Sequence, residues 1–122
     1  MPAPNDFEGT APEYAVYQAL VRLGFEGRFE FQSSRLGGRA THGGVVIDFY
    51  IPELHLAINV QGMYWHMERA GAIATDILQR AAIEASGIIL VYIDEDDALR
   101  NAEWYVSEAI RGLDHSRVGA GL

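Results

Sequence analysis

The chain of 122 residues contains no cysteine and no lysine, and it has few basic residues of any kind. The absence of cysteine excludes disulfides and thiolate metal ligands. No apolar run reaches the roughly 18 residues that a membrane-spanning helix needs. The first residues, MPAPNDFEGT, lack the basic and apolar blocks of a signal peptide. We therefore expect an intracellular, cytoplasmic protein with no membrane contact.

Negative charge dominates the ionisable residues of the chain. The chain has nine arginines and 17 acidic residues, and its net charge is -8. This balance argues against nonspecific nucleic-acid binding over the whole surface, although a local basic patch is compatible with it. Hydrophobic residues make up 49% of the chain, which excludes a disordered protein. We predict an N-terminal arm over 1–9, a single domain over 10–112 and a C-terminal tail over 113–122.

Periodicity and turn residues predict an α/β protein with the element order αβββαβα. Helices are expected over 11–23, 66–86 and 94–112, and strands within 26–34, 44–51, 54–61 and 88–93. Thr10 and Glu13 form a T-x-x-E capping box at the start of the first helix. Because the last strand follows a helical crossover, we expect a mixed sheet with helices on both faces.

The stretch VIDFYIPELHLAINVQG, residues 46–62, predicts a hairpin that reverses at Pro52. Alternation places Val45, Ile47 and Phe49 on one face of its first strand, and Asp48 on the other. The second strand has a clean apolar face made of Leu54, Leu56, Ile58 and Val60. Asp48, Asn59 and Gln61 then converge on the opposite side. One carboxylate and two amide oxygens can ligate Mg²⁺, but the same residues also suit a hydrogen-bonded, solvated sheet face.

The same stretch resembles the PD-(D/E)XK nuclease superfamily, in particular its small, very-short-patch-repair-like endonuclease branch. The pattern there is D-F-Y-x-P-E-x-x-x-A-I-E-V-x-G, and the chain matches it at nearly every position. TAPE on the first helix, and Asp76 with Arg80 on the later one, fit the same family. The resemblance covers residues 10–93.

The resemblance implies a restriction-endonuclease-like αβββαβ core with an extra C-terminal helix. It also implies hydrolysis of DNA phosphodiester bonds with Mg²⁺ or Mn²⁺. Asp48 would be the first metal ligand, position 59 the second acid and position 61 the lysine-like residue. Glu13 would be an additional acid near the metal, and His66 would lie at the edge of the pocket.

The chain departs from this family pattern at two positions, where it has Asn59 and Gln61. An amide oxygen binds Mg²⁺ less strongly than a carboxylate and removes one negative charge from the site. Three explanations remain open: Glu13 compensates, the metal site is degenerate, or Asn59 is an engineered substitution.

Several other residues have a functional and a purely structural interpretation. Arg35, Arg39 and His42 lie in a glycine-rich loop that either grips phosphates or is simply flexible. Arg80 would contact DNA, although a helix-surface ion pair with Asp76 is the stronger interpretation. The acids of 94–97 suit a solvated helix start better than a second metal site.

Two functional hypotheses follow. The first is a metal-dependent DNA endonuclease from repair, a phage or a mobile element. The second is a catalytically inactive nuclease-fold module that binds protein partners or DNA ends. A protein partner or a homo-oligomer is compatible with both.

Overall fold

The computed structural model describes residues 4, 6–38, 45–62 and 70–117. Its elements are α1 (Ala11–Leu20), β1 (Glu30–Ser33), β2 (Ile47–Ile51), β3 (Leu56–Gln61), α3 (Ala70–Ala85), β4 (Ile89–Asp94) and α4 (Glu95–Ile110). A short 3₁₀ turn, Pro52–Leu54, joins β2 to β3. Within the described ranges, no helix combines the length and apolar character needed to cross a bilayer.

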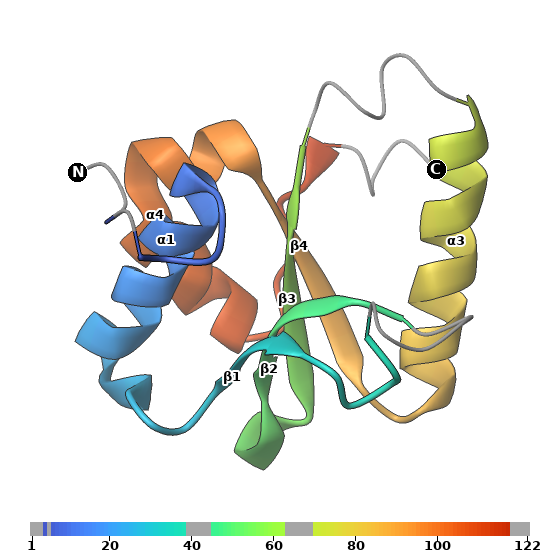
Figure 1. Ribbon diagram of the computed structural model, residues 1–122, viewed down its shortest axis with the longest axis horizontal. Helices are drawn as coiled ribbons and strands as arrows, with labels where there is room; N and C mark the ends of the chain where they lie inside the picture. The colour runs from blue at the N-terminus through green and yellow to red at the C-terminus, as the bar shows by residue number, and fades with distance from the viewer. Residues whose placement is uncertain (1–3, 5, 39–44, 63–69, 118–122) are drawn as a thin grey trace.

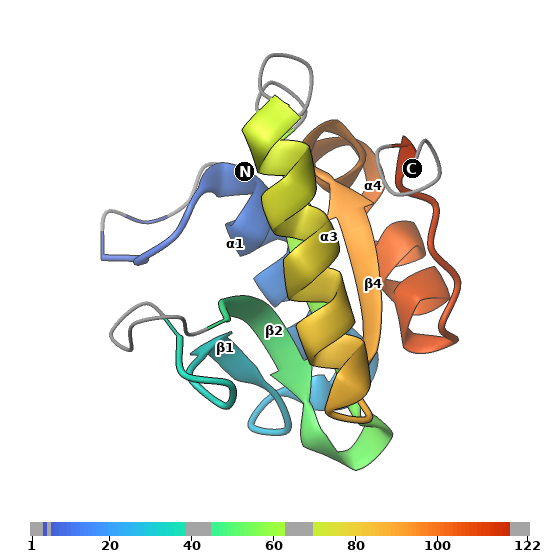
Figure 2. The ribbon, with the colours of Figure 1, turned by 90° about the vertical axis from the view of Figure 1, so that its right-hand side faces the viewer.

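The four strands form one mixed sheet in the order β1-β2-β3-β4. β2 is antiparallel to both β1 and β3, whereas β4 runs parallel to β3. Helices α1 and α4 cover one face of the sheet and α3 covers the other (Figures 1 and 2). The predicted α/β class, with helices on both faces of a mixed sheet, is confirmed.

The first helix begins as its sequence predicts and ends earlier. Thr10 and Glu13 make both bonds of the capping box. Regular α-helix stops at Leu20 instead of Leu23 and continues as a wider turn over Val21–Phe25. Gly24 has φ 94°, a backbone conformation that glycine adopts without a steric penalty, so it turns the chain toward β1.

Two hydrophobic clusters hold the layers together. The larger one packs the inner faces of α1 and α4 against Phe49, Leu56 and Ile58 of the sheet. The smaller one joins Ile83 of α3 to the other face of the sheet. The apolar face predicted for the second hairpin strand is confirmed, because Leu56 and Ile58 belong to the larger cluster and the partly buried Leu54 and Val60 pack against it.

The predicted faces of β2 are partly wrong. Phe49 packs toward α1 and α4, whereas Ile47 belongs to the cluster on the α3 side. The alternation breaks at Asp48, whose neighbour across β1 is Gln32, with φ 51°. A residue with positive φ turns a strand out of its regular pleat, and strand alternation assumes an unbroken pleat.

Candidate functional site on the β2–β3 hairpin

Asp48 and Asn59 lie opposite each other on β2 and β3, one step beyond the Phe49–Ile58 pair. The backbone N–H of Asp48 donates to Asn59 Oδ1 over 2.9 Å. In return, the N–H of Val60 donates to Asp48 Oδ2 over 2.8 Å. Asn59 Nδ2 donates to the carbonyl of Val46 over 3.3 Å. Side chains therefore join the two strands where the regular backbone ladder stops.

Both ends of the Asn59 amide are used in this arrangement. Its side chain is buried, with 7% of the residue exposed, so each hydrogen bond replaces one that water would have made. The oxygen accepts and the nitrogen donates. A carboxylate has no donor and could not bond the Val46 carbonyl. An amide is therefore the side chain that fits position 59 in this fold.

Gln61 extends the same strand face toward β4. It is half-buried, and its register partner on β4 is Asp94. Gln61, which stands where the family pattern has a lysine, therefore lies two residues beyond Asn59 on β3 and beside Asp94 at the end of β4.

Glu13 is nearly buried, with 9% of the residue exposed, and caps its own helix. Its Oε1 accepts from the N–H of Thr10 over 2.8 Å, and its own N–H donates to Thr10 Oγ1 over 3.3 Å. Within the described part of the chain, the hydrogen bonds of this carboxylate go to the helix N-terminus. The cap alone accounts for an acid at this position.

Of the residues expected to bind DNA, two can be placed. Arg35 bonds Glu30 over 2.7 Å and lies 4.7 Å above the ring of Tyr50. Its hydrogen bond holds the pKa of the Glu30 carboxyl below its usual range. Arg80 lies 3.6 Å from Asp114 and 4.7 Å above the Tyr92 ring. Arg39, His42 and His66 lie outside the described residues, as does the side chain of Asp76.

Ion pairing extends to every arginine in the described ranges. The pairs are Arg22–Glu103, Arg28–Glu53, Arg35–Glu30, Arg80–Asp114, Arg100–Asp97, Arg111–Glu108, and Arg117 with Asp94 and Asp96. A phosphate would have to compete with a carboxylate at each of them.

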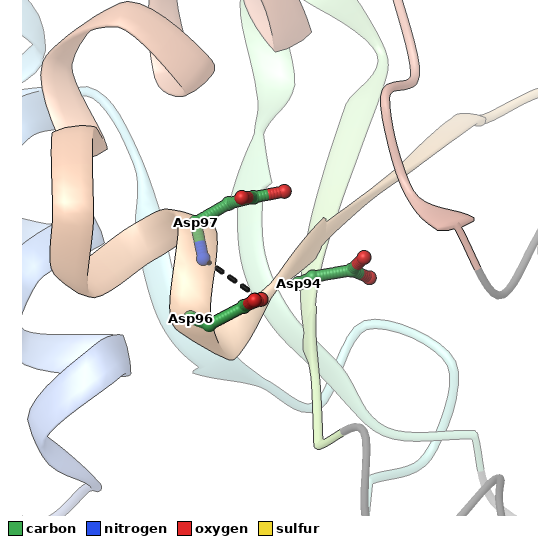
Figure 3. Close-up of side chains that lie close together, drawn as sticks. All are labelled: Asp94, Asp96 and Asp97. Atoms are coloured by element: carbon green, nitrogen blue, oxygen red, sulfur yellow. Dashed lines mark hydrogen bonds between the residues drawn. The ribbon is translucent and has the colours of Figure 1, made fainter.

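A cluster of three acids lies where β4 passes into α4. Carboxylate oxygens of Asp94, Asp96 and Asp97 all lie within 4.8 Å of one another, and such a donor set could hold a metal ion (Figure 3). The prediction of a solvated helix start is wrong for two of them, because Asp94 is fully buried and Asp97 is 4% exposed. Arg117 pairs with Asp94, and Arg100 of α4 pairs with Asp97, which makes this burial possible.

Arg117 is the main cation of this cluster. Its Nε lies 3.0 Å from Asp94 Oδ2, and its guanidinium also pairs with Asp96. The hydrogen bond from Arg117 holds the pKa of the Asp96 carboxyl below its usual range. The run of acids is visible in the sequence, but nothing there shows that an arginine some 20 residues later neutralises it.

At least two shallow grooves lie on the described surface, and neither of these two is lined by Asp48, Asn59 or Glu13. One of about 320 Å³ is bordered by Tyr14, Tyr17, Gln18, Val21, Arg22 and Glu26. The other, of about 300 Å³, is bordered by Gly27, Arg28, Phe29, Glu30, Pro52 and Glu53. The hairpin pair therefore lies apart from both.

Comparison with models of known protein families gives no match, and searches of curated proteins and of solved structures find no similar protein.

Proposed function

We propose that the chain is a nuclease-fold module that does not cleave DNA and acts by binding a protein partner. The observation that carries this proposal is the bonding of Asn59. Its amide uses an acceptor and a donor to join β2 to β3. A carboxylate, which the nuclease pattern has at this position, has no donor and could not make the bond to the Val46 carbonyl.

The arrangement of elements supports the nuclease-fold part of the proposal. The order α1, β1, β2, β3, α3, β4, with β4 parallel to β3, agrees with the restriction-endonuclease-like core that the family resemblance implies. Asp48 and position 59 are neighbours across the hairpin, as paired metal ligands would be. The proposed module thus keeps the order of elements of a nuclease. The side-chain oxygens that would bind a metal in a nuclease accept hydrogen bonds from backbone N–H groups instead.

The donor set at the hairpin suits a divalent cation poorly. Mg²⁺ prefers carboxylate and water oxygens in near-octahedral geometry. Asp48 contributes one carboxylate, one oxygen of which accepts from Val60, and the Asn59 oxygen accepts from the Asp48 N–H. Glu13 is bonded to its own helix N-terminus. Among the described residues, the Asp48–Asn59 pair therefore offers one negative charge, and part of the acceptor capacity of this carboxylate is already used.

The pairing of the arginines favours protein over DNA as the partner. DNA-binding surfaces gain affinity from cations that neutralise phosphates. Here each described arginine already neutralises an acid of the chain, and the net charge is -8. An acidic surface of this kind repels a phosphate backbone and attracts basic protein segments.

A metal-dependent DNA endonuclease is the second candidate. It is favoured by the half-buried carboxylate of Asp48 at the point where the β2–β3 ladder gives way to side-chain bonds. In that case Asp48 and Glu13 would hold Mg²⁺ or Mn²⁺, with Asn59 and Gln61 beside them, and the ion would activate water and offset phosphoryl charge.

A cleavage assay separates the two candidates. Labelled single-stranded, duplex, mismatched and branched DNA would be incubated with Mg²⁺ or Mn²⁺ and the natural chain, Asp48→Ala, or the double variant Asn59→Glu with Gln61→Lys. We expect no cutting by the natural chain above the Asp48→Ala background. We expect metal-dependent cutting by the double variant that disappears when Asp48→Ala is added.

Cutting by the natural chain that Asp48→Ala abolishes would overturn the proposal in favour of the endonuclease. Asn101→Glu controls for an added charge, because Asn101 is exposed on α4. If the folded double variant does not cut, the hairpin is not a nuclease scaffold, and the fold part of the proposal fails.

A further inference from the structure

Residues 113–117, here named the strap, lie along the outer edge of β4. Within the described residues β4 is the last strand of the sheet, so its outer edge has N–H and C=O groups that no strand in this part of the chain pairs. Asp114 Oδ2 accepts the N–H of Tyr92 over 3.1 Å. The carboxylate thus occupies the place that a carbonyl of a neighbouring strand would take. Figures 1 and 2 both show this red segment beside β4.

The strap is fastened at its far end by Asp94. Ser116 Oγ donates to Asp94 Oδ1 over 2.7 Å. The backbone N–H and the Nε of Arg117 both donate to Asp94 Oδ2 over 3.0 Å. Asp94 is fully buried, although it is also the first residue before α4. Its side chain does not cap that helix, so its carboxylate is available to the strap.

Polar contacts, more than burial, hold the strap in place. Leu113 is 41% exposed, and the side chains of His115 and Arg117 are 40% and 53% exposed. Arg80 of α3 approaches Asp114 from the other side at 3.6 Å. Of the ion pairs of the strap, Arg117–Asp96 is exposed at both side chains, so it contributes little and is screened by salt, whereas the carboxylate of the Arg117–Asp94 pair is buried. Because the strap buries little apolar surface, we expect its local opening to need only a small part of the free energy of global unfolding.

An opened strap would leave an edge with a defined chemistry. It would present the Tyr92 N–H together with the carboxylates of Asp94, Asp96 and Asp97, three acids within 4.8 Å. Such an edge suits an extended segment that supplies a carbonyl or carboxylate to β4 and an arginine to the acids. A second copy of the chain would bring the same acids and another net charge of -8, so it would be repelled.

We propose that the strap is an internal stand-in for an extended, arginine-bearing segment of a partner protein. That segment displaces the strap, pairs with the free edge of β4 and places its arginine among the three acids. This inference rests on the proposed function as a partner-binding module, and it names the surface and the chemistry of the partner.

The test uses the full chain and, as the probe, a synthetic peptide with the sequence of residues 112–117, GLDHSR. The Tyr92 amide is followed by NMR in the natural chain, in Arg117→Ala and in Arg28→Ala. Arg28 is a matched control, because its exposed side chain pairs with Glu53 of the β2–β3 turn and lies outside the strap.

We expect the Tyr92 N–H of Arg117→Ala to exchange with solvent roughly tenfold faster or more, because its strap is open more often. The peptide should bind this variant roughly tenfold more tightly than the natural chain, where the attached strap competes. A peptide with alanine in place of its arginine should not bind. Arg28→Ala should match the natural chain.

Equal peptide binding by all three proteins, or none by Arg117→Ala, would overturn the proposal. So would self-association of Arg117→Ala, because the edge would then accept a second copy. Exchange at Ile58, in the β2–β3 ladder, reports whether a variant is folded, and Ser116→Ala is a milder opening variant for the same measurements. Cleavage of DNA by the natural chain would refute the proposed function and leave the peptide result standing.

Discussion

At position 59, an amide and a carboxylate differ by one hydrogen-bond donor, and the hairpin uses that donor. Asn59 Nδ2 bonds the Val46 carbonyl while Oδ1 bonds the Asp48 N–H. Aspartate has nearly the same shape, but it would place an acceptor against that carbonyl and a second charge beside Asp48. The family resemblance treats position 59 as a metal ligand, whereas its contacts make it a cross-strand connector.

Asn59→Asp is therefore expected to destabilise the fold by about 1–3 kcal/mol, the usual cost of leaving a buried polar group without its partner. Urea unfolding at neutral pH measures the change. Asn101→Asp is the matched control, since Asn101 is exposed and its bond within the described residues uses Oδ1, which accepts from the Trp104 N–H and which aspartate keeps. Equal stability of Asn59→Asp and the natural chain would show that the donor bond contributes nothing.

The sequence predicts which site residues are neighbours better than it predicts what they bond. Alternation and the tight turn at Pro52 predict that Asp48 and Asn59 converge on one side of the hairpin, and in the structure the two residues are hydrogen-bonded neighbours. The bonds from these side chains to the strand backbone are not predictable from periodicity, which treats strands as regular. The acids that pair with Arg80 and Arg117 lie more than 20 positions away, beyond the reach of any local pattern.

At the scale of elements, the start of α1 bears on whether Glu13 caps the helix or binds a metal. Its carboxylate accepts from the Thr10 N–H, and its own N–H bonds the Thr10 hydroxyl. Both interactions belong to a capping box, which stabilises a helix N-terminus by satisfying backbone donors that have no partner inside the helix.

Thr10→Ala is expected to lower the free energy of unfolding by about 1 kcal/mol, the typical loss of an N-cap side chain. Glu13→Gln should cost less, because glutamine keeps an oxygen that accepts from Thr10. Thermal and urea unfolding measure both. If Mg²⁺ raises the melting temperature of the natural chain but not that of Glu13→Gln, Glu13 holds a metal and the capping interpretation is insufficient.

The elements themselves are predictable because their signals are local: a capping box, strand alternation and a glycine that ends a turn. The strap is the exception. LDHSR is polar and follows Gly112, which is typical of a tail. Its value to the fold lies in the contacts of Asp114, Ser116 and Arg117 with β4, and these depend on the sheet order. No local propensity encodes an interaction with the edge of a sheet.

For the whole molecule, charge is unevenly balanced. Seventeen acids share nine arginines, and the described arginines are all committed to ion pairs. The remaining acids give the surface its negative charge. Such a surface favours basic partners and association rates that fall with salt. The negative charge of the whole molecule disfavours binding to the phosphate backbone of DNA.

The same ion pairs set how stability depends on pH. Hydrogen bonds from Arg35, Arg28 and Arg117 lower the pKa values of Glu30, Glu53 and Asp96, respectively. Their pKa values are therefore lower in the folded than in the unfolded chain, where carboxyls titrate near about 4. Below that pH the unfolded state binds more protons, so the free energy of unfolding rises with pH there.

We expect stability from these pairs to be fully present above about pH 5 and to fall as the pH drops through the lowered pKa values, below about pH 4. Urea unfolding across this range measures the slope, and high salt should flatten it because the pairs are exposed. Glu53→Gln should reduce the slope, since it removes the bidentate bond to Arg28, whereas Glu26→Gln, exposed and outside these three pairs, should leave it unchanged. A stability that stays constant down to about pH 3 would mean that the pairs persist in the unfolded chain or contribute nothing to the folded one.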